Sequence, residues 1–332
     1  MKFYSLNQFS LCTDEIFFRY LDDIHSNDAI VIFNPADAMV VAPVLLRSRK
    51  TLEEHISYVQ KNKVKKAIII AEDIGFLKQC PSLEYLWIIP ALAAEDFDYS
   101  PIYELPNIKW LQCETMYGIR AMYDVEEKVK VANIDYRRLT GVKRLVISGA
   151  KGHQNVSAAE NVVSLQFNSG FPASKTLSSF TPKADLSYFS VCQAPIQSLE
   201  GIEDLHSVRR LELLYNRRLS DISALRHLRD SLAYLEINTC GRICDFSVLS
   251  ELTNLEFLTL KGSNTLNNLS FLKELPKLKN LQITMNVKDG DLSLCEMVPY
   301  VRIKNHKHYS HKNTELPKNF TDPDSFYPAD LL

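Results

Sequence analysis

The carboxyl-terminal half of the chain repeats one apolar pattern four times, with 24, 23 and 23 residues between successive copies. Each copy has two leucine or isoleucine residues separated by one polar residue, and an asparagine, cysteine or serine follows three places later. The copies are Leu211-Glu212-Leu213 with Asn216, Leu235-Glu236-Ile237 with Cys240, Leu258-Thr259-Leu260 with Ser263, and Leu281-Gln282-Ile283 with Asn286. This period predicts a curved stack of coils, because no single coil can bury its apolar edges alone.

Each copy also predicts its own local structure. Apolar and polar residues alternate around the leucines, which is typical of a short strand with its leucines turned inward. Apolar residues three apart follow, and this spacing places them on one face of a short helical or 3₁₀ turn. These sets are Ile196/Leu199/Ile202, Leu219/Ile222/Leu225, Ile243/Phe246/Leu249 and Leu266/Leu269/Leu272. The polar residue after each strand is expected to bond backbone groups of the neighbouring coil.

The stretch over residues 196–283 resembles leucine-rich-repeat proteins, most closely their short-period internalin-like class, in which a D-I-S-x-L motif follows the turn as at residues 221–225. The resemblance implies an α/β solenoid. This is a leucine-rich-repeat horseshoe with a parallel concave β-sheet, short helical, 3₁₀ or irregular convex segments, and an α/β amino-terminal cap. Weaker copies of the strand pattern reach back to residues 67–69, but alanine, glycine or methionine replaces asparagine in them.

Three parts are expected along the chain: an amino-terminal cap region over residues 1–63, the solenoid over residues 64–304, and a polar tail over residues 305–332. The solenoid is expected to be irregular before about residue 185 and regular over residues 186–290. Within the cap we expect a helix over residues 14–25, a buried strand over residues 29–33, and a helix over residues 51–61 that Thr51 and Glu54 cap. Residues 300–303 predict a last strand.

Composition and motifs exclude several classes of function. A net charge of -2 disfavours a general nucleic-acid or membrane binder. The seven cysteines form no disulfide framework and fit a reducing compartment. Cys113 at an inward strand position and Cys240 at the asparagine position after a strand are expected to be structural thiols. Residues 1–14 lack the features of a signal peptide, and no apolar run is long enough to span a bilayer. We therefore expect a cytoplasmic protein.

Motifs for catalysis, cofactors or metals are missing from the sequence. It has no phosphate-binding loop, no G-x-S-x-G and no CxxC pair. His306, His308 and His311 lie close together, but the basic residues among them oppose a dication, and no cysteine or carboxylate completes a ligand set. A solvated cap or basic contact patch is the expected role of this segment. We predict no catalytic residue, no cofactor and no metal.

The concave face is the expected functional surface, and its residues flank the inward leucines of each strand. We expect these positions to be exposed, and aromatic residues and arginine at exposed positions are typical of protein-binding hot spots. The alternative is that some of these aromatic side chains fold over neighbouring coils. The predicted partner-binding residues are Tyr188, Arg210, Glu212, Tyr234, Glu236, Phe257, Trp110 and Trp87.

Two functions from different classes remain open. The first is a non-enzymatic module that binds a protein partner through its concave face, as a monomer or in a 1:1 complex; a narrower form is an intracellular immunity protein that neutralises a toxin or effector enzyme. The second is an enzyme or small-ligand receptor with its site in the irregular amino-terminal region. A complex that survives gel filtration favours the first, and a ligand that stabilises the isolated chain favours the second.

Overall fold

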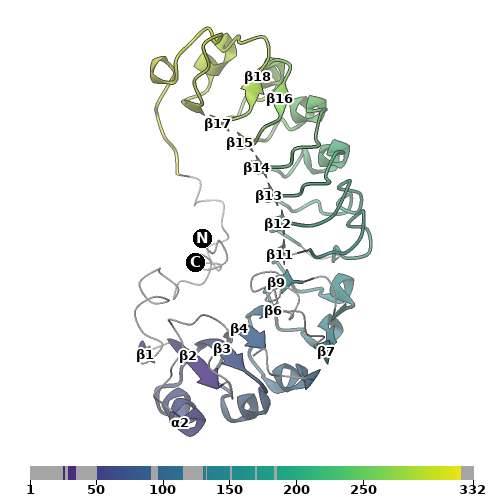
Figure 1. The fold of residues 1–332 in the computed structure, drawn as a ribbon, viewed down its shortest axis with the longest axis vertical. Helices are drawn as coiled ribbons and strands as arrows, with labels where there is room; N and C mark the ends of the chain where they lie inside the picture. The colour runs from purple at the N-terminus through teal and green to yellow at the C-terminus, as the bar shows by residue number, and fades with distance from the viewer. Residues whose placement is uncertain are drawn as a thin grey trace. The chain divides into compact units, whose positions relative to one another are not determined.

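A computed structural model describes residues 25–26, 29–34, 51–90, 96–114, 130–131, 133–149, 152–168, 170–182 and 185–322. The chain divides into two compact units, Met1–Asn161 and Val162–Leu331. In both, parallel strands stand side by side, one from each coil, and short 3₁₀ segments return along the other side of the coil (Figure 1). Within the described ranges, no helix is both long and apolar enough to cross a membrane.

The first unit opens with a mixed α/β segment. Strands β1 (His25–Ser26) and β2 (Ala29–Asn34) pair antiparallel, and β2 pairs parallel with β3 (Lys66–Ala71). Helix α2 (Leu52–Asn62) connects β2 to β3; Thr51 caps it, and Glu54 closes the capping box as expected. The predicted strand and second helix of this segment are confirmed, whereas residues 14–24 of the predicted first helix lie outside the described ranges.

The rest of the first unit consists of parallel strands and 3₁₀ turns. Ile69, Leu86, Leu111 and Leu145 of successive strands are almost fully buried, because inward positions alternate with positions on the opposite face of the sheet. The elements are η3 (Gly75–Gln79), β4 (Tyr85–Pro90), β5 (Asp96–Phe97), η4 (Ser100–Glu104), β6 (Trp110–Glu114), β7 (Lys130–Val131), β8 (Ile134–Asp135), η5 (Tyr136–Arg138), β9 (Arg144–Ser148), β10 (His153–Gln154) and η6 (Val156–Ala158).

The second unit repeats the coil with greater regularity. Its sheet strands pair parallel in the sequence register, so that Leu211, Leu235, Leu258 and Leu281 lie side by side. The elements are β11 (Ser164–Asn168), β12 (Tyr188–Cys192), β13 (Arg210–Leu214), η7 (Ser223–Leu228), β14 (Tyr234–Asn238), η8 (Ser247–Glu251), β15 (Phe257–Lys261), β16 (Thr265–Leu266), η9 (Ser270–Glu274), β17 (Asn280–Ile283), β18 (Asn286–Val287), η10 (Ser293–Met297), β19 (Tyr300–Ile303) and η11 (Asn313–Glu315). The predicted α/β solenoid architecture and the last strand are confirmed.

A buried ladder of polar side chains links neighbouring coils. The Asn216 side chain accepts a hydrogen bond from the Ala194 backbone N–H at 2.9 Å and donates to the Val191 carbonyl at 2.8 Å. Cys240 occupies the same place in the next coil, and its Sγ lies 3.4 Å from the Leu213 carbonyl. These contacts confirm the expected role of the residue after the strand, because each bonds the backbone of the preceding coil.

The sequence places the ladder residue of the third copy wrongly. Ser263 is exposed, whereas Asn264 is buried and donates to the carbonyls of Cys240 and Ile243 at 3.1 and 2.8 Å. Gly262 causes the shift, because its φ of 137° changes the direction of the chain. As a result, Asn264 rather than Ser263 takes the buried ladder position. In the fourth copy Met285 is fully buried and Asn286 only half-buried. The ladder residue of the third copy is therefore Asn264 and not the predicted Ser263.

Gly201 supports a close approach between coils in the second unit. Its φ is 108°, and a Cβ there would lie 2.3 Å from the Ser178 backbone nitrogen. We expect Gly201→Ala to lower the free energy of unfolding by about 2–4 kcal/mol, through left-handed strain and steric overlap. Urea denaturation of this variant and of Gly241→Ala provides a matched test. At Gly241 the nearest atom to a new Cβ is the Ser263 hydroxyl at 3.9 Å, so equal losses would contradict the prediction.

Candidate functional site

The concave face of the second unit gathers six of the predicted partner-binding residues in two rows. Strand pairing sets Tyr188, Arg210, Tyr234 and Phe257 side by side in the first row, at the first position of β12 to β15. Two strand positions later, Glu212 and Glu236 form the second row, between Ser190 and Thr259. The alternation of side chains along a strand places both rows on the face opposite the leucines.

An ion pair lies at the centre of this face. Arg210 donates from Nε and one terminal nitrogen to Glu212 Oε1, at 2.8 and 2.6 Å. The hydroxyl of Tyr188 donates to the other oxygen, Glu212 Oε2, at 2.9 Å. Arg210 and Glu212 are only 6% and 8% exposed, so both charges are largely out of water and each needs the other. This geometry fixes the two charges in one arrangement.

Aromatic rings extend the arrangement toward β15. The Arg210 guanidinium lies 3.9 Å from the centroid of the Tyr234 ring, a short cation–π contact. Tyr234 stacks on Phe257 with 6.1 Å between centroids and 24° between planes. Together the three side chains form a continuous packed layer on the concave face.

A second, more accessible charge cluster lies beside the rings. Glu236 accepts hydrogen bonds at 3.2 Å from the Tyr234 hydroxyl, from the Asn238 side-chain amide, and from Lys261 Nζ. The Lys261 side chain is 38% exposed. Asn238 and Lys261 were missed by sequence reasoning, although they occupy the fifth position of their strands and the alternation of side chains places them on the same face.

The expectation that the aromatic residues and arginine of this face are exposed is wrong. Tyr188, Arg210, Tyr234 and Phe257 are all buried, and Glu236 keeps partial exposure. The reason is lateral packing, because adjacent strands bring long side chains close enough to lie on one another, as the alternative interpretation proposed. Trp110 and Trp87 belong to the first unit, where both are also buried, opposite Tyr85 and Gln112 of β4 and β6.

The first unit contains a buried histidine–tyrosine pair. The Tyr136 hydroxyl lies 2.8 Å from His153 Nδ1, and His153 Nε2 lies 3.1 Å from the Ser148 carbonyl. A carbonyl only accepts, so Nε2 carries the proton and the tyrosine hydroxyl donates to Nδ1. Burial lowers the pKa of His153 to about 4 and raises the pKa of Tyr136 well above its usual value. The pair therefore stays neutral at neutral pH.

This pair predicts acid sensitivity. Between pH 6.5 and pH 4 an unfolded chain binds a proton at His153 that the folded chain does not, so stability falls as pH falls through that range. We expect a loss of about 2 kcal/mol between pH 7 and pH 5. Urea unfolding at both pH values measures it, and His153→Gln is expected to remove most of the difference. An unchanged pH dependence in the variant would contradict the assignment.

The buried cysteines are poor nucleophiles. Burial raises the pKa of Cys80 and Cys240 to about 11 and the pKa of Cys192 and Cys295 to about 12. These four thiols are protonated at neutral pH, whereas a catalytic cysteine acts as the thiolate. Cys113 and Cys240 are fully buried, as expected of structural thiols at an inward strand position and at the asparagine position of the repeat.

The histidines near the carboxyl terminus pack as part of a cap on the last coil. His306, His308 and Tyr309 contact one another with ring centroids 4.7 to 5.9 Å apart. The Tyr309 hydroxyl accepts from the Val287 backbone N–H at 2.8 Å, and His311 pairs with Glu296 at 3.1 Å. Among the described residues, no group of three histidine, cysteine or acidic side chains is arranged to hold a metal ion.

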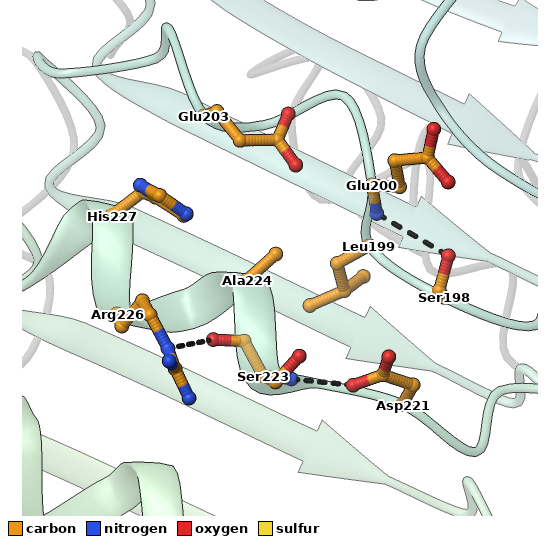
Figure 2. A pocket seen from close by; sticks show the side chains of 9 residues that line it. All are labelled: Ser198, Leu199, Glu200, Glu203, Asp221, Ser223, Ala224, Arg226 and His227. Atoms are coloured by element: carbon orange, nitrogen blue, oxygen red, sulfur yellow. Dashed lines mark hydrogen bonds between the residues drawn. The ribbon is translucent and has the colours of Figure 1, made fainter.

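A shallow hollow of about 300 Å³ lies on the side of the coils away from the sheet. Figure 2 shows side chains that line it, among them the acidic Glu200, Glu203 and Asp221 and the basic Arg226 and His227. The backbone N–H of Ser223 donates to Asp221 Oδ1 at 2.8 Å and holds the pKa of that carboxyl below its usual value. Equivalent aspartate–serine turns occur at Asp245 and Asp291, so this aspartate has a structural role in the repeat.

The sequence matches no protein-family profile and no curated protein. Solved structures similar to the chain include two internalins of Listeria monocytogenes, inlF and inlC2. The inlF match has 18% identity, a TM-score of 0.48 and covers 81% of this chain and 83% of the other. The inlC2 match has 21% identity, a TM-score of 0.39 and covers 53% and 79%.

A third similar structure is the leucine-rich-repeat ectodomain of the Arabidopsis thaliana receptor kinase GASSHO1/SCHENGEN3, solved in complex with CASPARIAN STRIP INTEGRITY FACTOR 2. It has 12% identity and a TM-score of 0.40, and covers 74% of this chain but 32% of the receptor chain. The fold itself is defined by the coils described above. Each of these coils contributes one strand to the main parallel sheet and returns through a 3₁₀ segment, and a buried asparagine ladder links coils with a period of 23 or 24 residues. The chain therefore has the fold of leucine-rich-repeat proteins.

Proposed function

We propose that the chain is a non-enzymatic module that binds a protein partner on the concave face of β12 to β15. The observation that carries the proposal is the fixed arrangement of Arg210, Glu212, Tyr234 and Glu236 on a face where the repeat itself requires none of these residue types. The ladder and the leucines hold the coils together from the other side of the sheet. Arginine, tyrosine and glutamate side chains that have no role in holding the repeat together support a role in recognition.

The physical properties of this face suit protein binding. Arginine and tyrosine provide most of the binding energy at many protein interfaces. Here they are already held by hydrogen bonds and stacking, which lowers the entropy lost on binding. The partly exposed Lys261 and the less exposed Glu236 give the face charges of both signs, which favour one orientation of the partner. In the first unit, Trp87 and Trp110 are proposed as further contacts.

In a narrower form of the proposal, the partner is a toxin or effector enzyme in the cytoplasm, neutralised in a 1:1 complex. A rigid patch that bears both charges can cover a partner's own site without any chemistry from the module. The narrower form therefore makes the same contacts and differs only in the identity of the partner.

The test is affinity capture from the native lysate with the full chain and with Lys261→Glu. We expect one stoichiometric protein to bind the unmodified chain and to bind the variant at least about tenfold more weakly, because the change reverses an accessible charge beside Glu236. Lys273→Glu is the matched control, since Lys273 is exposed in η9 on the other side of the coil.

Equal capture by both variants would contradict a concave-face site. If a toxin or effector enzyme is the captured protein, the narrower form is supported. Failure of any protein to bind, together with a small molecule that raises the melting temperature of the isolated chain, would favour the alternative of a ligand receptor or enzyme.

A further inference from the structure

Four basic side chains lie along the edge of the sheet where strands β13 to β15 end, and we call them the basic edge. They are Arg217 and Arg218 in the turn after β13, Arg242 in the turn after β14, and Lys261 as the last residue of β15. The three arginines are exposed, and Lys261 is partly exposed. Lys261 Nζ also bonds Glu236 at 3.2 Å, so the basic edge adjoins the concave face.

The turns that carry the arginines stack on one another. The Tyr215 N–H donates to the Asn238 carbonyl at 2.7 Å, which joins the turn after β13 to the end of β14. Tyr215 and Thr239 adopt the same left-handed conformation, with φ of 56° and 57°. The residues three places later, Arg218 and Arg242, therefore occupy equivalent positions in adjacent coils. Neighbouring strands lie about 4.8 Å apart, so the two arginines start from closely spaced backbones.

The positive charges of the basic edge are not balanced locally. The turns after β13, β14 and β15 contain no acidic residue, over residues 213–220, 237–244 and 260–273. Within the described ranges, the side chains of Arg217, Arg218 and Arg242 form no hydrogen bond or ion pair. The whole chain has a net charge of -2, so this local excess does not reflect its overall composition.

Two exposed arginines on the other side of the same coils are paired. Arg226 lies 3.7 Å from a carboxylate oxygen of Glu251, and Arg229 lies 3.7 Å from one of Asp230. By contrast, the arginines of the basic edge have only like charges beside them. Like charges held this close repel one another, and an anion placed between them relieves the repulsion. The basic edge is therefore suited to an acidic ligand.

The carboxylates of the adjoining concave face indicate which acidic ligand fits. Glu236 lies beside Lys261, and Glu212 lies one strand further along the same row. A nucleic-acid backbone carries only negative groups, so these glutamates oppose its approach. A protein surface can bring carboxylates to the arginines and a basic group to Glu236. Carboxylates also form paired, parallel hydrogen bonds with arginine.

We propose that the basic edge binds an acidic segment of the protein partner, with carboxylates on Arg217, Arg218 and Arg242. A basic group of the same partner then lies near Glu236. The inference rests on the proposed function, because it names the chemistry of the partner that the concave face binds. It also extends the binding surface from the face of the sheet to its edge.

Fluorescence anisotropy with the full chain tests the inference directly. The probe is a dye-labelled peptide with a block of glutamates followed by two glycines and two lysines. We expect the variant Arg217→Glu/Arg218→Glu/Arg242→Glu to bind this peptide at least about tenfold more weakly than the unmodified chain. Circular dichroism melting is expected to be unchanged, since the replaced side chains form no bonds within the described ranges.

The matched control is Arg226→Glu/Arg229→Glu/Lys273→Glu, which changes the net charge equally on the other side of the coils. We expect it to bind the peptide nearly as well as the unmodified chain. Equal weakening in both triple variants would overturn the inference, because net charge alone would then attract the peptide. Failure of the unmodified chain to bind the peptide would also overturn it. Tighter binding of a single-stranded oligonucleotide with the same net charge would overturn it in favour of nucleic acid.

Capture from the lysate separates this inference from the proposed function. If Lys261→Glu loses the captured protein and the triple variant of the basic edge retains it, the concave-face site stands and the acidic segment is wrong. If the peptide binds as expected but the lysate yields no protein, the basic edge remains a site for carboxylates and the proposed function fails.

Discussion

Replacing Asn216 with alanine is expected to lower the free energy of unfolding by about 2–4 kcal/mol. The side chain joins two coils through hydrogen bonds to the Ala194 N–H and the Val191 carbonyl, and it is completely buried. Alanine leaves both backbone groups buried without these bonds, and an unsatisfied buried polar group costs about 1–3 kcal/mol. Urea denaturation followed by circular dichroism measures the loss.

Asn286→Ala is the matched control for this variant. The sequence pattern gives Asn216 and Asn286 the same role, but Asn286 is half-buried and Met285 fills the buried position beside it. We expect the control to lose less than about 1 kcal/mol. Similar losses at the two positions would mean that the ladder bonds contribute little and that any substitution in this turn is equally costly.

The sequence predicts the strands well because the inward leucines are under a single strong constraint. A shift of one residue would turn every leucine of a strand to the opposite face, so the alternation alone specifies the register. The weaker early copies also form strands, as at Leu86-Trp87-Ile88 and Leu145-Val146-Ile147, although the sequence left their register open. The cap helix is equally readable, because Thr51 and Glu54 complete a capping box within four residues.

The turns are less predictable because their geometry depends on backbone conformation rather than on burial alone. Counting residues after β15 places Ser263 in the ladder, but Gly262 adopts a left-handed conformation and Asn264 takes the slot. The sequence signal for this shift is Gly262, since glycine adopts a left-handed conformation without a steric cost.

The candidate site shows a different limit of sequence reasoning. Alternation correctly places Arg210, Glu212 and Tyr234 on the concave face, but it contains no information about how long side chains lie on one another. The burial of Arg210 follows from its bonds to Glu212 and its contact with Tyr234, which join residues from two strands. Such contacts are set by side-chain conformation, and no pattern of apolar residues specifies them.

Glu212→Gln is expected to lower the free energy of unfolding by about 3 kcal/mol, because it leaves the buried Arg210 guanidinium without its carboxylate. The double variant Arg210→Met/Glu212→Gln removes both charges and is expected to recover a large part of that loss. A double-mutant cycle with Arg210→Met measures the coupling between the two residues by urea denaturation.

Glu236→Gln provides the contrast, since its partner Lys261 is 38% exposed and solvent screens the pair. We expect a loss below about 1 kcal/mol for this variant. If Glu212→Gln and Glu236→Gln are equally mild, the Arg210–Glu212 pair is not held out of water and cannot be a preorganised part of a binding face. If instead the double variant keeps native stability and loses the captured partner, the pair serves recognition, because its removal weakens binding strongly and lowers the free energy of unfolding only slightly.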